Sequence, residues 1–393
     1  MLQLRKPLRL ADRSSEQEIQ ISCVRSFDLL GARRAEWNAL VERSQNATVF
    51  QTFEWHASWW RTFGDDFGLL VVCAERAGRL VGLAPLMVAK RRILGRRLRV
   101  LHFIGLYASD YCDFIIDDAD PEALPAMLRW LADNTDVWDG LDLRNLVEGS
   151  PTLVSVAAFF AQQGDPVDLR RWGEAPSYVF GDPKADRDLL RKKSLRRHCN
   201  RFERSGKLEF YHFRTAREIS TRLEAFFRQH IERWDATDTP SQFLAERQRS
   251  FYREMVDLLA PTGALLLSVV SFNDAPIAFH LGFEYRNRFI WYKPTYDISL
   301  ARHSPGEVLL KCLFEHAHNG GLQEFDFAPG EEAFKYRFAN HARSICSVHV
   351  FKDRLTWRYD RLRFAARMAV KGSPRLARLG RRFLGRLYGR LWY

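Results

Sequence analysis

The chain has 393 residues, of which 46% are hydrophobic and 13% aromatic, enough to build packed cores and to exclude disorder of the whole chain. Its length predicts two domains, and no apolar run reaches the roughly 18–20 residues that a membrane span needs. The six cysteines are far apart and form no Cys-x-x-Cys pair, so we expect reduced thiols in a cytoplasmic protein and no metal site.

The net charge of +12 is concentrated in three segments. Residues 90–99, 191–207 and 361–393 carry +6, +7 and +10, so the rest of the chain carries −11. The basicity is therefore predicted to belong to local surfaces and not to the fold.

The first half is predicted to begin with a strand at 19–25, where Ile19, Ile21 and Cys23 alternate with polar neighbours. Helices are expected at 29–44 and at 52–63, the second capped by Thr52. A hairpin with strands 69–75 and 80–88 turns at Gly78. Later elements are expected as strands at 98–103, 111–116 and 140–146 and as helices at 121–134 and 153–163.

Residues 173–186 contain Pro176, Gly181 and Pro183 and are predicted to link the halves. The second half is expected to begin with a basic helix at 188–206. Further expected elements are helices at 219–237, 242–259 and 307–318 and strands at 265–272, 276–285, 289–293 and 323–327. Leu69–Leu86 and Leu265–Gly282 share one hairpin pattern, which predicts two copies of one α/β unit. Hairpins of this kind are common, so unrelated halves remain the alternative.

A phosphate-binding helix start is the main candidate for chemistry. Ser304-Pro305-Gly306 opens the helix after a strand, with Ser304 expected to cap it, and Arg302 and His303 precede it. The free N–H groups and positive dipole end of such a helix suit phosphate groups. The alternative reading is capping chemistry alone.

In the same region, Tyr296 and Asp297 lie between the strand and this helix. Catalytic groups are usually presented on loops held by regular elements, so we expect Tyr296 and Asp297 to carry acid–base chemistry. The rival view is that Tyr296 packs and Asp297 caps a turn. Tyr292 competes with Tyr296, but strand alternation predicts that it is buried.

The chain resembles the CelD-type, BioF2-like acetyltransferases of the GNAT superfamily, which are related to the FemAB peptidyltransferases. The resemblance spans roughly residues 20–350 and is carried by an ordered set of motifs: Phe50–Trp55 with Trp59-Trp60, Gly82–Leu86, Ser109–Asp113, Lys193–Gly206, Tyr296-Asp297, Ser304–Gly306, Asp326-Phe327 with Gly330, and Lys335. One departure is Phe202, which replaces the usual leucine in the basic helix.

This resemblance implies an α/β fold of tandem GNAT-like domains, each a mixed twisted sheet flanked by helices. We expect a non-catalytic half at 19–175, an acyltransferase half at 186–355 and a basic helical tail at 356–393. It implies transfer from acyl-CoA, such as acetyl-CoA, to an amine or hydroxyl. Such transfer to an amine needs a base and a proton donor for the departing thiolate, and we expect Asp297 and Tyr296 in these roles. A cell-envelope or exopolysaccharide precursor is one expected acceptor, lipid-linked or glycan.

The expected substrate-binding residues are Ser109, Asp110, Tyr111 and Asp113, which are expected to line an acceptor groove, together with Asp326 and Lys335. For Asp326 and Lys335, a structural ion pair that holds a loop is the equal alternative.

Two other functions stay open at this level. One is a FemAB-like transferase that uses aminoacyl-tRNA, the only case in which we expect nucleic acid as a partner. The other is a catalytically silent scaffold at the membrane. Residues 373–393 alternate arginines with leucines and predict an amphipathic helix, either peripheral at an anionic membrane surface or packed on the protein itself.

Overall fold

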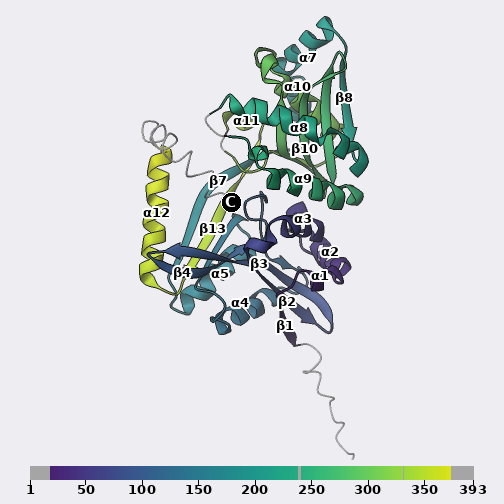
Figure 1. Ribbon diagram of the computed structural model, residues 1–393. Helices are drawn as coiled ribbons and strands as arrows, with labels where there is room; N and C mark the ends of the chain where they lie inside the picture. Colours follow the sequence, from purple (N-terminus) through teal and green to yellow (C-terminus); the bar gives the residue numbers. More distant parts are fainter. Residues whose placement is uncertain (1–17, 238–239, 331, 373–393) are drawn as a thin grey trace, which may run out of the picture.

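The computed structural model describes residues 18–237, 240–330 and 332–372 (Figure 1). In this part of the chain, helices flank one mixed sheet with the strand order β1-β2-β3-β4-β6-β13-β7-β12-β11-β10-β9-β8, and β5 pairs with β3. The strands are β1 (Ile19–Val24), β2 (Gly68–Arg76), β3 (Arg79–Ile93), β4 (Arg96–Phe103), β5 (Ile115–Ile116), β6 (Gly140–Val147), β7 (Val167–Val179), β8 (Leu208–Phe213), β9 (Leu265–Phe272), β10 (Ala275–Tyr285), β11 (Arg288–Tyr296), β12 (Glu324–Asp326) and β13 (His341–Phe351).

The helices connect and cover these strands. They are α1 (Asp28–Gly31), α2 (Arg34–Arg43), α3 (Phe53–Phe63), α4 (Ala123–Asp133), α5 (Pro151–Gln162), α6 (Pro183–Leu190), α7 (Lys193–Ser205), α8 (Ala216–Asp235), α9 (Glu246–Leu259), α10 (Pro305–Asn319), α11 (Ala333–Tyr336) and α12 (Arg354–Gly372). Thr52 caps α3 as predicted, since its side chain accepts a hydrogen bond from the Trp55 amide. The predicted basic helix at 188–206 is instead two helices, α6 and α7, because Lys192 is not helical.

The two halves repeat one order of elements, which confirms the predicted tandem fold. Apart from the short α1 and β5, the series β1, α2, α3, β2, β3, β4, α4, β6 corresponds to β8, α8, α9, β9, β10, β11, α10, β12. Each half has antiparallel neighbours followed by one parallel pair, β4 with β6 and β11 with β12.

The halves exchange their last strands. β7 follows the elements of the first half but pairs with β12, whereas β13 ends the second half and pairs with β6. β7 and β13 also pair with each other, which joins both halves into one sheet. The predicted linker is therefore wrong for residues 173–179, because Gly173 and Pro176 lie within β7 opposite Ile345 and Ala342.

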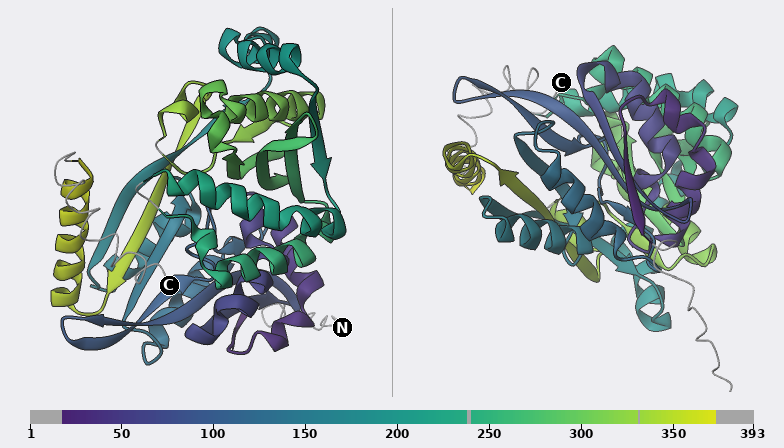
Figure 2. Two further views of the ribbon diagram at one scale, coloured as in Figure 1. Left: turned by 45° about the horizontal axis from the view of Figure 1, so that its top comes forward. Right: turned by 90° about the horizontal axis from the view of Figure 1, so that it is seen from below.

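An aromatic core joins the halves away from the exchanged strands. Phe50 and Trp55 of the first half meet Phe251, Phe283 and Tyr292 of the second, with ring centroids 5.6–5.9 Å apart. Both views of Figure 2 show the purple helices of the first half beside green helices of the second, consistent with the packing of α3 on α9. Large shared burial of this kind fixes the halves relative to each other.

Only the beginning of the predicted tail can be described. Within it, α12 lies against the first half, where Arg170 donates to Asp360 at 2.6 Å and stacks over Phe364. The predicted amphipathic helix at 373–393 lies outside the described residues. Of the helices in the described ranges, none is both long enough and apolar enough to cross a membrane.

Candidate functional site

The parallel strands β11 and β12 diverge soon after they meet. They pair only at Arg288–Glu324, Phe289–Phe325 and Ile290–Asp326, and β12 ends there. β11 continues to Tyr296, and along these last six residues it pairs with β10 on one side and with no described strand on the other. In this stretch the Pro294 carbonyl accepts from Arg233 at 3.0 Å and the Tyr292 amide donates to His280 at 3.1 Å. The remaining backbone groups on this free edge can bind an extended ligand as an added strand would.

The N-terminus of α10 lies just beyond the end of β11. η5 (Ile298–His303) turns the chain, and Ser304 adopts a left-handed conformation with φ 56° at the helix start. The prediction that the Ser304 side chain caps the helix is wrong, because its hydroxyl makes no capping hydrogen bond. Arg302 and His303 are joined by a hydrogen bond of 3.1 Å next to this helix start.

Tyr296 and Asp297 have structural partners at this point. The Arg233 guanidinium lies 4.3 Å from the centre of the Tyr296 ring. Asp297 accepts hydrogen bonds from the Ser299 amide at 2.9 Å and from its hydroxyl at 2.6 Å, so its carboxylate caps η5. These contacts favour a positioning role for Asp297, whereas the Tyr296 side chain stays partly exposed.

A loop of the first half reaches this region. Ser109 accepts a hydrogen bond from the Trp55 indole at 2.8 Å and is buried, so it anchors the loop. Asp113 is also buried and accepts a hydrogen bond of 2.7 Å from Ser150 at the start of α5. The structure therefore separates Ser109 and Asp113 from the residues that face the second half.

Asp110 of this loop lies among charges of the second half. Burial raises the pKa of its carboxyl to about 6, and the nearby ammonium groups of Lys293 and Lys335 oppose that rise. Asp326 and Glu332 lie close enough to raise the pKa further. A carboxyl with this pKa is ionised near neutral pH yet still basic enough to accept a proton.

Tyr111 fixes the end of β12. Its hydroxyl is 2.8 Å from both carboxylate oxygens of Asp326, and Arg343 of β13 approaches Asp326 at 3.5 Å. Burial raises the pKa of Asp326, with a further contribution from Glu324, while Arg343 opposes it. The structure thus brings Asp110, Tyr111 and Asp326 together at the point where β11 and β12 part.

Lys335 lies beside this group but forms other contacts. Its ammonium is buried, pairs with Glu332 at 3.0 Å and donates to the carbonyls of Ala328 and Pro329 at 3.2 and 3.3 Å. No direct bond between Asp326 and Lys335 occurs in the described structure. Lys335 therefore closes the loop after β12 and adds positive charge near Asp110.

Several polar residues of the site lie in sequence surroundings that did not indicate a functional role. Lys293 comes from β11, Arg233 from α8 and Tyr252 from α9. Tyr292 is buried as predicted, and its hydroxyl donates to the Ala108 carbonyl at 2.8 Å, beside the Tyr252 hydroxyl at 3.3 Å. Among the described residues, no group of three or more His, Cys, Asp or Glu side chains is arranged to hold a metal ion.

A known protein family matches the half of the chain that carries this geometry. Residues 190–336 match the acetyltransferase (GNAT) domain family. This segment is a GNAT acetyltransferase domain. It contains the free edge of β11, the start of α10, Asp326 and Lys335.

Solved structures share the fold of the longer chain around this GNAT domain. FemX is 12% identical, with a TM-score of 0.56 over 80% of this chain and 95% of that one. A conserved protein of unknown function from Bacteroides thetaiotaomicron is 13% identical, with a TM-score of 0.53 over 81% of this chain and 97% of that one. Curated protein sequences give no match.

The first half has the same strand divergence as the GNAT domain, but its own loop lies there. β4 and β6 pair only at Val100–Gly140 and Leu101–Leu141. Beyond that point, Asn145 of β6 accepts from the Cys112 amide at 2.9 Å and donates to the Ser109 carbonyl at 2.7 Å. The same loop that presents Asp110 therefore lies along β6.

Proposed function

We propose that the protein is an acyl-CoA-dependent N-acyltransferase that modifies an amine. The observation that carries this proposal is the divergence of β11 and β12 directly before the N-terminus of α10. A pantetheine arm needs an extended edge with free backbone groups, and its phosphates need a positive helix end. In the GNAT domain, the free edge of β11 is followed directly along the chain by the N-terminus of α10.

The donor end of the site is formed by η5 and α10. Arg302 and His303 add positive charge, and Gly306 keeps the first turn open, since a Cβ there would lie 3.2 Å from the Tyr296 ring. Pro305 has no amide hydrogen to leave unsatisfied at the first helical position. Phosphate oxygens are proposed to bind here.

Asp110 is proposed as the base that takes the proton from the acceptor amine. It lies beside both strands at the point of divergence, and its raised pKa suits proton transfer near neutral pH. Amide groups on the free edge of β11 would stabilise the tetrahedral oxyanion. Tyr296 is proposed to protonate the departing thiolate.

The acceptor is proposed to approach from the first half, which contributes Asp110 and Tyr111. That half is proposed to lack a second transfer site, because its own loop lies along β6 where β4 and β6 diverge. The proposed acceptor is a cell-envelope or exopolysaccharide precursor that carries a free amine or a hydroxyl. This part of the proposal rests on the motif resemblance.

Aminoacyl-tRNA is a second candidate donor. The row of arginines on α7 next to the proposed donor site can bind nucleic-acid phosphates, but acidic residues beyond its ends favour a smaller anionic partner. The shared fold with FemX is consistent with it but does not identify a donor.

Purified protein should release free thiol from acetyl-CoA when an amine acceptor from a panel of amino sugars and amino acids is added. Thiol appearance measured with a chromogenic disulfide, together with the mass of the acylated product, tests the proposal. Transfer from aminoacyl-tRNA with no turnover of acyl-CoA would favour the second candidate and contradict the first. Turnover of neither donor with any amine would contradict both.

A further inference from the structure

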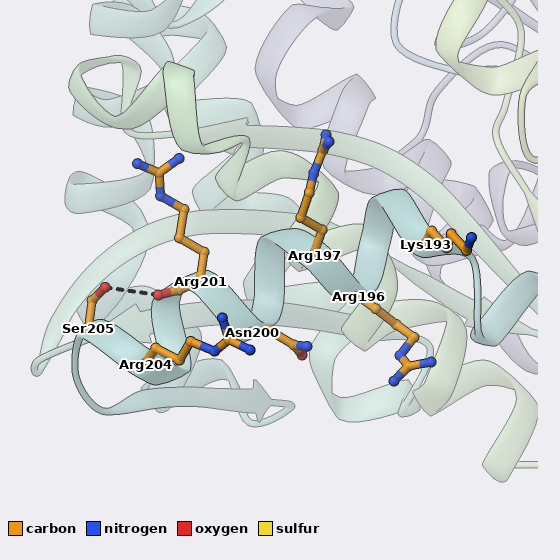
Figure 3. A pocket seen from close by; sticks show the side chains of 7 residues that line it. All are labelled: Lys193, Arg196, Arg197, Asn200, Arg201, Arg204 and Ser205. Carbon is orange, nitrogen blue, oxygen red and sulfur yellow. Dashed lines mark hydrogen bonds between the residues drawn. The ribbon is translucent and has the colours of Figure 1, made fainter.

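One face of α7 carries a row of cations without acidic partners. Lys193, Arg196, Arg197, Arg201 and Arg204 recur at spacings of three and four residues and are exposed. In the described structure, none of the five forms an ion pair, and together with two neutral polar side chains they line a hollow on the surface (Figure 3). We call these five residues the α7 stripe, which extends over about 16 Å of helix.

Exposed arginines elsewhere on the surface have acidic partners, in contrast to those of the α7 stripe. Arg61 pairs with Glu254 at 2.6 Å, and Arg247 pairs with Asp66 at 2.5 Å, although these arginines are exposed too. Five like charges along one helix repel one another unless an anionic partner is bound. Four of the five are arginines, whose planar guanidinium groups suit carboxylates and phosphates.

The α7 stripe adjoins the proposed donor site. His198 of the same helix lies 3.8 Å from Glu307 in the first turn of α10. Arg201 lies close enough to His303 to lower the pKa of its imidazole, after the larger effect of desolvation. Glu307 places a negative charge in the first turn of α10 and pairs with Arg337 at 3.0 Å, so α7 adds its positive charge to that of Arg302 and His303.

Acidic residues limit the α7 stripe at both ends. Beyond its C-terminal end, Lys207 meets Glu209 at 2.8 Å and the exposed Asp274 at 3.8 Å. On the preceding helix α6, Asp188 is exposed, as is Asp182 at the N-cap, together with Lys184 and Arg187. A long nucleic acid or a flat anionic membrane would extend past the stripe and meet these carboxylates, whereas one acidic helix of a small protein would not.

The apolar side of α7 also argues against insertion into a membrane. Leu195, Cys199 and Phe202 are buried in the protein, so the exposed side offers no apolar anchor. No aromatic side chain lies in the α7 stripe to stack on unpaired bases. The exposed side of α7 therefore suits the docking of a partner that presents carboxylates.

We propose that the α7 stripe docks an acidic carrier protein, which delivers the acyl group on a phosphopantetheine arm. This inference rests on the proposed acyl transfer and identifies the donor more closely. The arm has the same thioester and inner phosphate as coenzyme A but is attached to a protein. The amine nitrogen attacks the thioester carbonyl, a C–N bond forms as the C–S bond breaks, and the amine proton ends on the carrier thiol.

Binding and turnover can be measured separately on the full-length chain. The probe is a bacterial acyl carrier protein acetylated on its phosphopantetheine arm, and its affinity is measured by fluorescence anisotropy. Arg196→Glu with Arg204→Glu should raise the Kd about tenfold, because two attractive contacts become repulsive. Arg217→Glu with Arg228→Glu, which reverses two exposed arginines of α8, is the matched control and should change the Kd less than about twofold.

The second measurement is the ratio of kcat/KM for the acylated carrier to that for acetyl-CoA. The stripe variant should lower this ratio about tenfold, and the control variant should leave it unchanged. An unchanged ratio, an absence of carrier binding, or tighter binding of duplex RNA with the same dependence on Arg196 and Arg204 would overturn the inference. Charge-dependent carrier binding without transfer from either donor would instead contradict the proposed acyl transfer and leave the docking face in place.

Discussion

Asp110 and Asp113 belong to one loop, and burial raises the pKa of each to about 6. Their partners differ. Asp110 faces Lys293 and Lys335 of the GNAT domain, whereas Asp113 accepts a hydrogen bond from Ser150 within the first half. The same perturbed pKa therefore accompanies a candidate base in one case and a buried structural contact in the other, and only the partners distinguish them.

Asp110→Asn should lower kcat by about 10²–10⁴-fold, because the variant cannot accept the amine proton. In the parent enzyme, activity should fall as the pH drops through about 6, since the base must be ionised to act. Steady-state kinetics across pH 5–8 measure both effects.

Asp113→Asn is the matched control for Asp110→Asn. It should cost about 1–3 kcal/mol of stability by disturbing buried hydrogen bonds, with near-normal turnover per folded molecule. Thermal unfolding of both variants separates the two roles. Full activity in Asp110→Asn would remove this carboxylate from the mechanism.

Tyr296→Phe and Asp297→Asn test the remaining candidates at the end of β11. Phenylalanine keeps the ring beneath Arg233 and removes only the proton donor, so kcat should fall about 10²-fold or more with little change in melting temperature. Asparagine keeps an oxygen that can accept the Ser299 amide hydrogen bond, so its effect on turnover should be small. If Asp297→Asn loses more activity than Asp110→Asn, the base is Asp297.

At the scale of single elements, the start of α10 should respond to charge. Gly306→Asp places a carboxylate where phosphate is proposed to bind and should weaken acetyl-CoA binding about tenfold or more. Gly306→Asn is the matched control, because it adds nearly the same bulk next to Tyr296 without the charge. Calorimetry that gives equal affinities for these two variants would contradict the placement of the phosphates.

Local patterns were sufficient for most elements but not for the exchanged strands. Both hairpins and the strand-to-helix passage at Ser304 were predictable, because alternation and turn residues are local signals. The sequence predicts a linker for residues 173–179 of β7 because Gly173 and Pro176 usually break strands, yet both lie within the sheet. β13 was missed because its pairing partners, β6 and β7, are far away in sequence.

The candidate site was predictable only in part for the same reason. Ser304–Gly306 follow one strand and Asp326 ends the next, so the donor side of the site could be predicted from the order of the elements. Asp110 was singled out, but its role depends on Lys293 and Lys335, which are contributed by the other half. No local spacing indicates that a loop of the first half meets the end of β11.

At the scale of the whole molecule, the strand exchange makes the halves dependent on each other. Ending the chain after residue 340 removes β13, whose Ile345, Val348 and Val350 are fully buried. We expect loss of cooperative unfolding in circular dichroism, because β6 is then left with an exposed edge. Ending the chain after residue 372 is the matched control and should preserve the melting transition. A well-folded product lacking β13 would contradict this dependence.

The same control variant tests membrane attachment through residues 373–393, which remains a proposal. The full chain should float with vesicles that contain anionic lipid, and the shortened chain should float less, because the removed segment combines arginines with leucines. Equal flotation of the two chains, or no flotation of either, would contradict attachment through this segment.

The exchange of β7 and β13 also has a consequence for synthesis on the ribosome. β6 is made before the GNAT domain, but its neighbour β13 emerges only after that domain, so the strands of the first half keep an open edge while the GNAT domain is being translated. An open strand edge is a site of mispairing with other nascent chains. We therefore expect ribosome-bound chains that stop before β13 to depend on chaperones, and chains released after β13 to lose that dependence.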